Sequence, residues 1–397
     1  MLGPTSPETE PLDGIALIEA TDRTDLQHLV ARFASRAARH DETATTSREN
    51  LADLQAAGLL ALTVPHEAGG GGGGLAAAAN VVGRVAEGDP STALILSMQY
   101  LQHAAVARST QWPERLRAVV ARAAVEDGAL LNALRVEPDL GTPARGGLPA
   151  TVARRTGDGW AVTGSKIYST GSTVLRWGVV WARTDEDAPR VGGFLVPMDA
   201  PGVSIERSWN QLGMRATESH TVHLDDVRLP PDHAADIRPP AAWGAPDPVQ
   251  SVWGSIVIAS LYDGVARAAR RWLLGFLRDR APTNLGAPLA TLPRFQEIVG
   301  EIDALLLANR LILAAAIAEE AAGGTTNSAQ GGLVKHLVTE NAIRAVEKAL
   351  AATGNPGLSR DNPLERHYRD VLCARVHTPQ ADVSLGLSGR LSLAAAP

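Results

Sequence analysis

The fold of this 397-residue chain is decided by the stretch Gly159-Trp160-Ala161-Val162-Thr163-Gly164-Ser165-Lys166-Ile167-Tyr168-Ser169-Thr170-Gly171. Apolar and polar residues alternate in its first half, which is the pattern of a half-buried β-strand. Similar short runs, bounded by Gly, Pro and Asp, follow at 177–182, 193–196 and 221–224. The pattern predicts an antiparallel β domain between about Leu130 and Pro240.

Helical patterns flank this β domain on both sides. From about Asp25 to Glu126 the apolar residues recur at spacings of three and four, and Asp89-Pro90 supplies an N-cap followed by a proline in the first turn. Beyond a Pro-rich connector, long helical stretches are predicted at about 249–280, 292–322, 328–353 and 363–376. We therefore predict an α+β protein with three domains, at 14–127 (helical), 128–238 (β) and 247–397 (helical).

Composition excludes several classes of protein. The chain is 45% apolar and 20% charged, which is typical of a globular protein, and its net charge of -6 offers no basic surface for nucleic acid. No signal sequence or run of about 18 apolar residues is present, so we expect a cytoplasmic protein that does not enter the membrane. The one cysteine, Cys373, excludes an internal disulfide and is expected to be an inert thiol.

Two patterns that could indicate ligand sites are better explained otherwise. The run Gly69 to Gly74 lacks the Gly-Lys-Ser/Thr ending of a phosphate-binding loop, so a flexible loop between two helices is predicted. The histidines lack metal-ligand spacings, and no metal is predicted; they include His66, His103, His220, His223 and His336.

Four motifs, in this order, resemble those of the acyl-CoA dehydrogenase superfamily. They are Leu134-Arg135-Val136-Glu137-Pro138-Asp139-Leu140-Gly141, Gly164 to Gly171, Leu212-Gly213-Met214-Arg215 and Pro363-Leu364-Glu365-Arg366-His367-Tyr368-Arg369-Asp370. The resemblance extends over nearly the whole chain. It implies an N-terminal helical domain, a central β-barrel-like domain, a C-terminal four-helix bundle and a bound flavin.

The resemblance also implies which residues flank the flavin ring. A flat, electron-rich ring needs an apolar or aromatic wall and a few fixed hydrogen-bond donors. The residues implied to lie against the ring are Leu134, Val136, Tyr168, Ser169 and Thr170, the last three on a strand, with an aromatic side chain covering one face. The alternative for Tyr168 is an ordinary aromatic residue of a core strand.

The catalytic base of the dehydrogenases is missing from this sequence. In most members a glutamate follows the Arg-Asp pair, but here that position is Thr378, preceded by His377. In other members the glutamate comes from the first long C-terminal helix, where this chain has Trp253-Gly254-Ser255. The nearest carboxylates, Asp263 and Asp382, are displaced by more than a helical turn. Dehydrogenation of an acyl-CoA is therefore disfavoured, because a base must lie within hydrogen-bond reach of the proton.

The same departures resemble a second branch of the superfamily, the two-component flavin-dependent monooxygenases. The matching segments are Asn132-Ala133-Leu134, Ser208-Trp209-Asn210, and Arg369-Asp370 followed by His377. Such enzymes receive reduced flavin from a separate reductase, add dioxygen at C4a, and transfer one oxygen from the hydroperoxide to an aromatic ring, heterocyclic sulfide or amine. This implies a small, aromatic or heterocyclic substrate.

The resemblance assigns roles at the site. Asn132 and Thr170 are the candidate neutral donors, and His377 is the candidate acid–base group because an imidazole titrates near neutral pH. The alternative for His377 is a helix-end histidine paired with a backbone carbonyl. The substrate pocket is predicted to include Tyr100, His103, Trp209 and Trp253, although Trp209 could equally be a core residue.

The identity of the flavin stays open. The family's adenosine site is represented by Arg280 and by Gly354-Asn355, but its Gln has become Ala351. A weakened adenosine site is compatible with loosely bound FAD, supplied reduced by a reductase, and with FMN as the alternative. A site shared between subunits, as the resemblance implies, predicts a homodimer or homotetramer. The CoA-side Gly-Ser-Asp appears here as Gly141-Thr142-Pro143, which puts CoA recognition in doubt.

Two other functions remain open. One is a dehydrogenase or oxidase of an unusual acyl thioester, which an acyl-CoA would bleach. The other is a non-catalytic subunit with a flavin fold, which would bind no reduced flavin.

Overall fold

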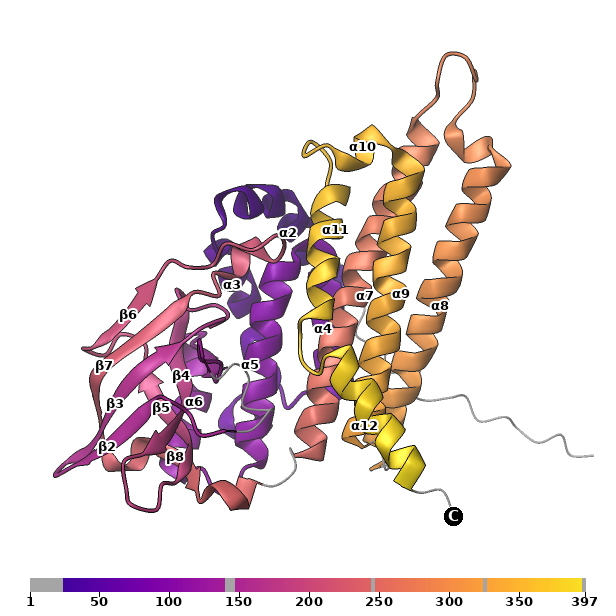
Figure 1. Cartoon of the computed structure of the whole chain (residues 1–397). Coiled ribbons are helices and arrows are strands. Elements are labelled where there is room, and N and C mark those ends of the chain that lie inside the picture. The colour runs from indigo at the N-terminus through magenta and orange to yellow at the C-terminus, as the bar shows by residue number, and fades with distance from the viewer. Residues whose placement is uncertain (1–23, 140–146, 244–246, 324–326, 395–397) are drawn as a thin grey trace, which may run out of the picture.

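The computed structural model describes residues 24–139, 147–243, 247–323 and 327–394. Within these residues the predicted order of helices, then strands, then helices is confirmed, with the sheet at one side of the molecule and the long helices at the other (Figure 1). The predicted domain boundaries stay predictions, and the one at residue 14 lies outside the described residues.

The N-terminal helices have the capping signals that the sequence predicted. The side chain of Asp89 accepts a hydrogen bond from the Ser91 N–H at 3.1 Å, and Pro90 occupies the first turn. A capping carboxylate satisfies a backbone donor that the helix itself cannot use. The helices are α2 (Thr24–Thr43), α3 (Arg48–Ala56), α4 (Leu75–Gly88), α5 (Pro90–Arg108) and α6 (Glu114–Glu126).

The glycine-rich segment is a loop before α4, as predicted, but the prediction that it is flexible was wrong. Its backbone N–H groups donate to the preceding segment, including Gly71 to the Ala61 carbonyl at 3.0 Å and Gly73 to the Leu62 carbonyl at 2.7 Å. A Cβ added at Gly70 would lie 2.3 Å from the Val64 carbonyl oxygen. Glycine is therefore needed here for close backbone packing rather than for flexibility.

The β domain is one mixed sheet, so the prediction of an antiparallel domain was only partly right. Both β1 and β2 run parallel to β4, whereas the other pairs are antiparallel. The alternating pattern reports which side chains are buried and not the direction of the neighbouring strand. The strands are β1 (Leu130–Leu134), β2 (Val152–Thr156), β3 (Gly159–Lys166), β4 (Leu175–Thr184), β5 (Val191–Pro197), β6 (Val203–Glu206), β7 (Thr221–Leu229) and β8 (Ala234–Arg238).

Four of the C-terminal helices agree closely with the predicted ranges, whereas those at 355–358 and 381–394 were not predicted. The C-terminal helices are α7 (Pro248–Asp279), α8 (Pro293–Ala321), α9 (Ser328–Thr353), α10 (Asn355–Leu358), α11 (Leu364–Leu372) and α12 (Ala381–Ala394). The three long helices and α11 form the predicted four-helix bundle, and α12 packs on α9. None of the helices within the described residues is both long and apolar enough to cross a membrane.

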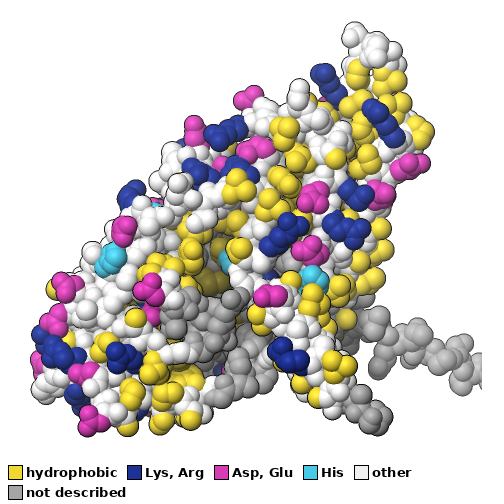
Figure 2. Space-filling model, in the orientation of Figure 1, with side chains coloured by type: hydrophobic (Ala, Val, Ile, Leu, Met, Phe, Trp, Pro, Cys, Tyr) yellow, Lys and Arg dark blue, Asp and Glu magenta, His cyan; other side chains and the backbone are white. Residues whose placement is uncertain are grey.

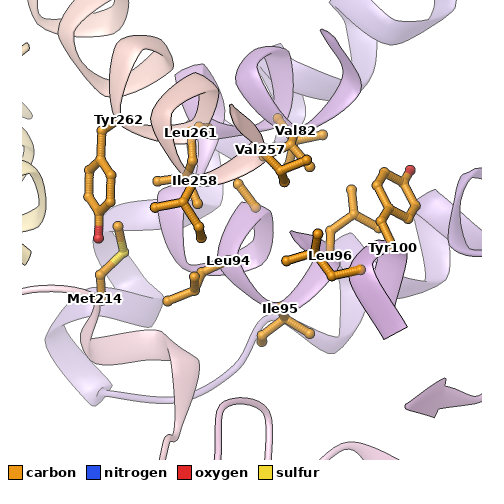
Figure 3. Close-up of a cluster of buried hydrophobic side chains, with 14 of the residues drawn as sticks. Val82, Leu94, Ile95, Leu96, Tyr100, Met214, Val257, Ile258, Leu261 and Tyr262 are labelled. Atoms are coloured by element: carbon orange, nitrogen blue, oxygen red, sulfur yellow. The ribbon is translucent and has the colours of Figure 1, made fainter. Parts of the chain in front are cut away.

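One hydrophobic core joins the N-terminal helices to the bundle. Figure 3 shows Val82 of α4, Leu94 of α5 and Val257 of α7 packed together, with Met214 and Tyr262 at one end of the cluster. Burying a side chain of this size contributes roughly 1.5–3 kcal/mol. Helices α5 and α7 are therefore a fixed support for the loop that contains Met214.

Candidate active site

The turn after β3 carries the residues predicted to flank a flavin, but it is not the strand that we predicted. Strand β3 ends at Lys166, and Tyr168 has a φ of 56°, in the left-handed region. The turn is tied down at both ends, because the Ile167 N–H donates to the Val136 carbonyl at 2.9 Å and the Gly171 N–H donates to the Thr217 carbonyl at 2.8 Å. A left-handed non-glycine residue in so constrained a turn is typical of a functional site.

Tyr168 and Trp209 form an aromatic wall beside this turn. The Tyr168 ring is 57% exposed, so the alternative that it is a core aromatic is wrong. Its centroid lies 6.2 Å from that of Trp209, with the rings edge to face at 79°. The Trp209 indole N–H donates to the Met214 carbonyl at 3.0 Å, which fixes its orientation. An exposed aromatic surface held in this way is suited to stacking with a flat ring.

Asn132 and Thr170, the two predicted donors, are in direct contact. The buried Asn132 amide donates from Nδ2 to the Thr170 carbonyl at 3.0 Å. The Ser219 hydroxyl donates to Thr170 Oγ1 at 3.2 Å, and it is 2.8 Å from the Thr217 hydroxyl. Because Thr170 Oγ1 accepts from Ser219, its own proton can point to a ligand. Asn132 therefore holds the turn, and the Thr170 hydroxyl is the donor that the turn presents.

His377 lies in the loop between α11 and α12, among the C-terminal helices. Its Nδ1 is 2.5 Å from the Tyr262 hydroxyl, so the alternative of a carbonyl-bonded helix-end histidine is wrong for the side chain. Burial, helped by the charge of Lys335, lowers the pKa of His377 to about 4. Our expectation that this imidazole titrates near neutral pH was therefore wrong, because the buried cation is disfavoured.

The Met214 loop joins the two halves of the site. The Met214 N–H donates to the buried carboxyl of Asp370 at 2.7 Å, and Arg369 donates to the Leu212 carbonyl at 2.9 Å. Burial raises the pKa of Asp370 to about 7. The hydrogen bonds of the described residues include none from His377 to Asn132 or Thr170, so this loop is the structural link between them. Burial also raises the pKa of Cys373 to about 12, as expected for an inert thiol.

The four residues predicted for the substrate pocket are not all brought together. Only Trp209 contacts the turn after β3 through Tyr168. Tyr100 is fully buried in the helical core, and its hydroxyl donates to the Leu59 carbonyl at 2.7 Å. The Trp253 indole donates to Glu320 at 2.8 Å. Buried His103 has no hydrogen-bond partner for Nε2 among the described residues, and burial lowers its pKa to about 4.

The residues predicted for the adenosine half of the cofactor lie elsewhere. Arg280 caps α7, and Gly354 and Asn355 begin α10, at the end of the bundle where α10 is labelled in Figure 1. All three are exposed. The described hydrogen bonds connect none of them to the turn after β3. The altered CoA segment, 141–143, lies outside the described residues.

Neither position of the missing base holds a carboxylate in place. Thr378 is exposed, and a Cβ added at Gly254 would meet no described atom within 4 Å, so position 254 borders open space. The carboxylate of Asp263 accepts from Arg267 at 2.9 Å and from Asn309 at 3.0 Å, and it is buried. A carboxylate held by two donors in this way is not available as a base.

The surface is hollowed between the sheet and the helical bundle. Figure 2 shows this hollow, with hydrophobic side chains gathered in and around it. Two pockets are found among the described residues: one of about 400 Å³ is lined by residues that include Arg48, Gln55 and Arg176, and one of about 210 Å³ borders Lys335 and Ala374. Neither is lined by the turn after β3.

The residues present fit the isoalloxazine ring that the resemblance implies. The exposed Tyr168 offers an aromatic face held against Trp209, and Thr170 offers a hydroxyl whose proton Ser219 does not use. The buried pair Glu137 and Lys166, 2.6 Å apart, joins the segment after β1 to the end of β3, where the turn begins. An aromatic wall and a fixed neutral donor are what a bound flavin ring requires.

Three residues of the site were missed by the sequence reasoning. Tyr262 belongs to the apolar pattern of α7, and its partner His377 is 115 positions away. Lys335 is a single lysine on α9, and Ser219 is one of several hydroxyl residues that follow the Leu212-Gly213-Met214-Arg215 motif. Of these three residues, Ser219 alone could have been identified from the sequence, because it lies close to this motif.

Family comparisons match most of the chain. The N-terminal, middle and C-terminal domain models of the acyl-CoA dehydrogenases match residues 22–110, 135–227 and 256–380, respectively. A Bacillus subtilis (strain 168) protein named "Putative acyl-CoA dehydrogenase YdbM" is 34% identical over 352 residues, which cover 88% of this chain and 90% of that protein.

Two further relatives are not named as acyl-CoA dehydrogenases. The L-evernosamine nitrososynthase of a Micromonospora species is 28% identical over 369 residues, covering 87% of this chain and 83% of that protein. The X-ray structure of KijD3 with FMN and dTDP-3-amino-2,3,6-trideoxy-4-keto-3-methyl-D-glucose is 27% identical, with a TM-score of 0.79 over 99% of this chain and 96% of that one.

Proposed function

This chain belongs to the acyl-CoA dehydrogenase family, and we propose that within it the protein works as a flavin-dependent monooxygenase. The family, a relative named as a nitrososynthase and a neighbour solved with FMN support a flavin oxidoreductase. The proposed substrate is a small aromatic or heterocyclic compound. An amine nitrogen is the alternative site of oxygenation, because two of the relatives are named for amino sugars or were solved with one.

One observation carries this proposal: a neutral His377–Tyr262 pair lies next to Thr378, the position at which most of the dehydrogenases have their glutamate base. Removal of an α-proton requires an unprotonated base whose pKa lies near the working pH and whose lone pair is within reach of the proton. The imidazole has a pKa of about 4, and its Nδ1 already contacts the Tyr262 hydroxyl. A pair of this kind can orient a neutral oxygen or nitrogen but is poorly suited to abstract a proton from carbon.

The residues of the site divide the work of an oxygen transfer. Bound reduced flavin would supply the two electrons that activate dioxygen at its C4a carbon. Thr170, whose hydroxyl accepts from Ser219, would donate a hydrogen bond to the ring, and Tyr168, held against Trp209, would cover it and exclude water. His377 donates a hydrogen bond on the substrate side. One oxygen atom enters the substrate, and the other leaves as water with two protons.

The partners follow from this reaction. Nothing in the sequence resembles a nicotinamide site, so a separate reductase is proposed to supply reduced FAD, with FMN as the alternative. A homodimer or homotetramer is proposed because Arg280, Gly354 and Asn355 have no described contact with the ring-binding turn of their own chain. A neighbouring subunit could complete each site.

The decisive experiment mixes the protein with chemically reduced flavin and then with oxygenated buffer in a stopped-flow instrument. Without protein, reduced flavin returns rapidly to its oxidised form and releases hydrogen peroxide. With protein, we expect the oxidised-flavin absorbance to return at least about tenfold more slowly, because a dry site slows the loss of peroxide. NADH alone should not reduce the bound flavin. Unchanged reoxidation, with full release of peroxide, would contradict the proposal.

Acyl-CoA dehydrogenation is the second candidate, favoured by the 34% identity to the Bacillus subtilis relative. With Thr378 and Gly254 at the two base positions, we expect saturated acyl-CoAs of any length to leave the oxidised flavin unbleached. A positioned base contributes about 10²–10⁴ to such a reaction. Turnover of a saturated acyl-CoA with an artificial electron acceptor would establish this second function instead.

A further inference from the structure

The protonation of the His377 ring depends on its contact with the Tyr262 hydroxyl. Tyr262 is fully buried on α7, and its hydroxyl oxygen lies 2.5 Å from His377 Nδ1. Burial, with smaller contributions from Cys373 and Asp370, raises the pKa of Tyr262 well above its ordinary value of 10. The phenol therefore keeps its proton. The described hydrogen bonds offer this proton no acceptor other than Nδ1, so we assign Tyr262 as the donor and Nδ1 as the acceptor. In Figure 3 its hydroxyl is at the end of the ring that faces Met214, at the edge of the buried cluster.

A neutral imidazole carries one N–H group. With Nδ1 accepting from Tyr262, that proton must be on Nε2. Burial and the Lys335 charge keep the ring neutral, because they lower the pKa of His377 to about 4. In this tautomer Nε2 has no lone pair in the ring plane, so it can donate a hydrogen bond but cannot accept a proton.

Lys335 holds the loop on both sides of this histidine. Its ammonium group, on α9, is 3% exposed and donates to the carbonyls of Ala374, His377 and Pro379 at 3.0, 2.6 and 3.0 Å. Three carbonyls use all three ammonium protons. The ion pairs of the described residues include none for Lys335. A buried lysine that binds only backbone is therefore arranged to fix a loop and not to neutralise an acid.

Other ionisable groups surround the pair. Tyr262 lies on α7, and Lys335 and Glu340 lie on α9. Asp370 lies on α11, and Cys373 follows the end of that helix. The Glu340 charge favours protonated Lys335, although burial lowers the pKa of Lys335 to about 8. Burial and cationic Lys335 disfavour an imidazolium at position 377.

We propose that Tyr262 and Lys335 are positioning residues that fix His377 as a neutral imidazole with its proton on Nε2. The side chain then presents a fixed hydrogen-bond donor rather than a general base. The target of this donor, a substrate at the site of oxygenation, rests on the function proposed above. The tautomer does not depend on that function.

The test is ¹⁵N NMR of the full chain labelled at histidine, with the His377 signals assigned by their loss in His377→Gln. Separate chemical shifts for Nδ1 and Nε2 report which nitrogen carries the proton. We expect an unprotonated Nδ1 and a protonated Nε2, unchanged between about pH 5.5 and 8, because an unperturbed histidine would titrate in this range. A protonated Nδ1, or a titration near pH 6.5, would overturn the proposal.

Matched variants separate positioning from general packing. Tyr262→Phe should give a mixture of the two His377 tautomers, whereas Tyr100→Phe, which also removes a buried hydroxyl, should leave the His377 signals unchanged. Lys335→Met should raise the His377 pKa by about one unit or more, because it removes a nearby positive charge. Lys348→Met, on the same helix but in an exposed pair with Glu301, should not.

The outcomes distinguish this proposal from the proposed function. The wild-type spectrum requires neither flavin nor oxygen, so it tests the tautomer even if no reaction is found. If Tyr262→Phe and Lys335→Met leave both the tautomer and the pKa of His377 unchanged, the two residues do not position it. If the tautomer is as expected but reduced flavin is reoxidised as in free solution, only the monooxygenase function fails.

Discussion

We expect His377→Ala to lower the rate of product formation by about 10²–10³, the usual loss when one preorganised hydrogen-bond donor is removed from a site. The substitution deletes the group that Tyr262 orients but leaves the aromatic wall and the Thr170 turn intact. Reduced flavin should therefore still bind. The measurement is a single turnover with chemically reduced flavin, oxygen and substrate, followed by quantification of the product.

The change also removes the partner of a buried hydroxyl. Tyr262 would lose its hydrogen bond at full burial, which costs about 1–3 kcal/mol of stability. Flavin titration and a thermal unfolding curve must therefore accompany the rate measurement. A loss of rate with unchanged flavin affinity places the effect in the reaction, whereas a loss of both places it in the fold.

His377→Gln distinguishes a donor from an acid–base group. The glutamine amide nitrogen can reach the approximate position of Nε2 and donate a hydrogen bond, but it does not titrate. If His377 acts as a neutral donor, Gln should be at least about tenfold faster than Ala. If Gln is as slow as Ala, the imidazole transfers a proton and the neutral-donor interpretation is wrong.

The helices and the order of the domains could be predicted from local signals. Helix α9 occupies the predicted range 328–353, because Asn327 caps its first turn and Gly354 ends it. The same local signals cannot show strand direction, and this explains the error about β1 and β2. They also cannot show a left-handed tyrosine, because only the surrounding hydrogen bonds hold Tyr168 in that conformation.

The site could be predicted in its residue types but not in its protonation. Position 377 was identified by its distance from Arg369-Asp370, yet an isolated histidine has a pKa near 6.5. Its value of about 4 arises from burial and from Lys335, a residue 42 positions away in the sequence. Contacts of this range follow from the packing of α7, α9 and the loop after α11. A single sequence carries no local sign of them.

The largest effect on stability is expected at Lys166, where β3 ends and the turn begins. Its ammonium group lies 2.6 Å from the Glu137 carboxylate, with side-chain exposures of 0% and 2%, and also donates to the Trp181 carbonyl. Burial lowers the pKa of Lys166 to about 8, although Glu137 opposes the shift. Lys166→Met would leave a buried carboxylate without its cation, and we expect the free energy of unfolding to fall by about 3–5 kcal/mol.

The control is the double variant Lys166→Met with Glu137→Gln. The amide oxygen can replace Oε1 and still accept from the Thr151 N–H, which now donates to Oε1 at 3.0 Å. The Ala150 N–H, which donates to Oε2 at 2.7 Å, loses its acceptor. We expect the double variant to recover at least about half of the lost stability in a urea titration, because no unpaired charge remains buried. Because Glu137 lies just beyond Val136, and Lys166 just before Tyr168, the single variant should also weaken flavin binding more than the double variant does. Equal stability of the wild type and the single variant would mean that Glu137 is protonated when the cation is absent, and that the Thr151 and Ala150 donors alone hold the two segments together.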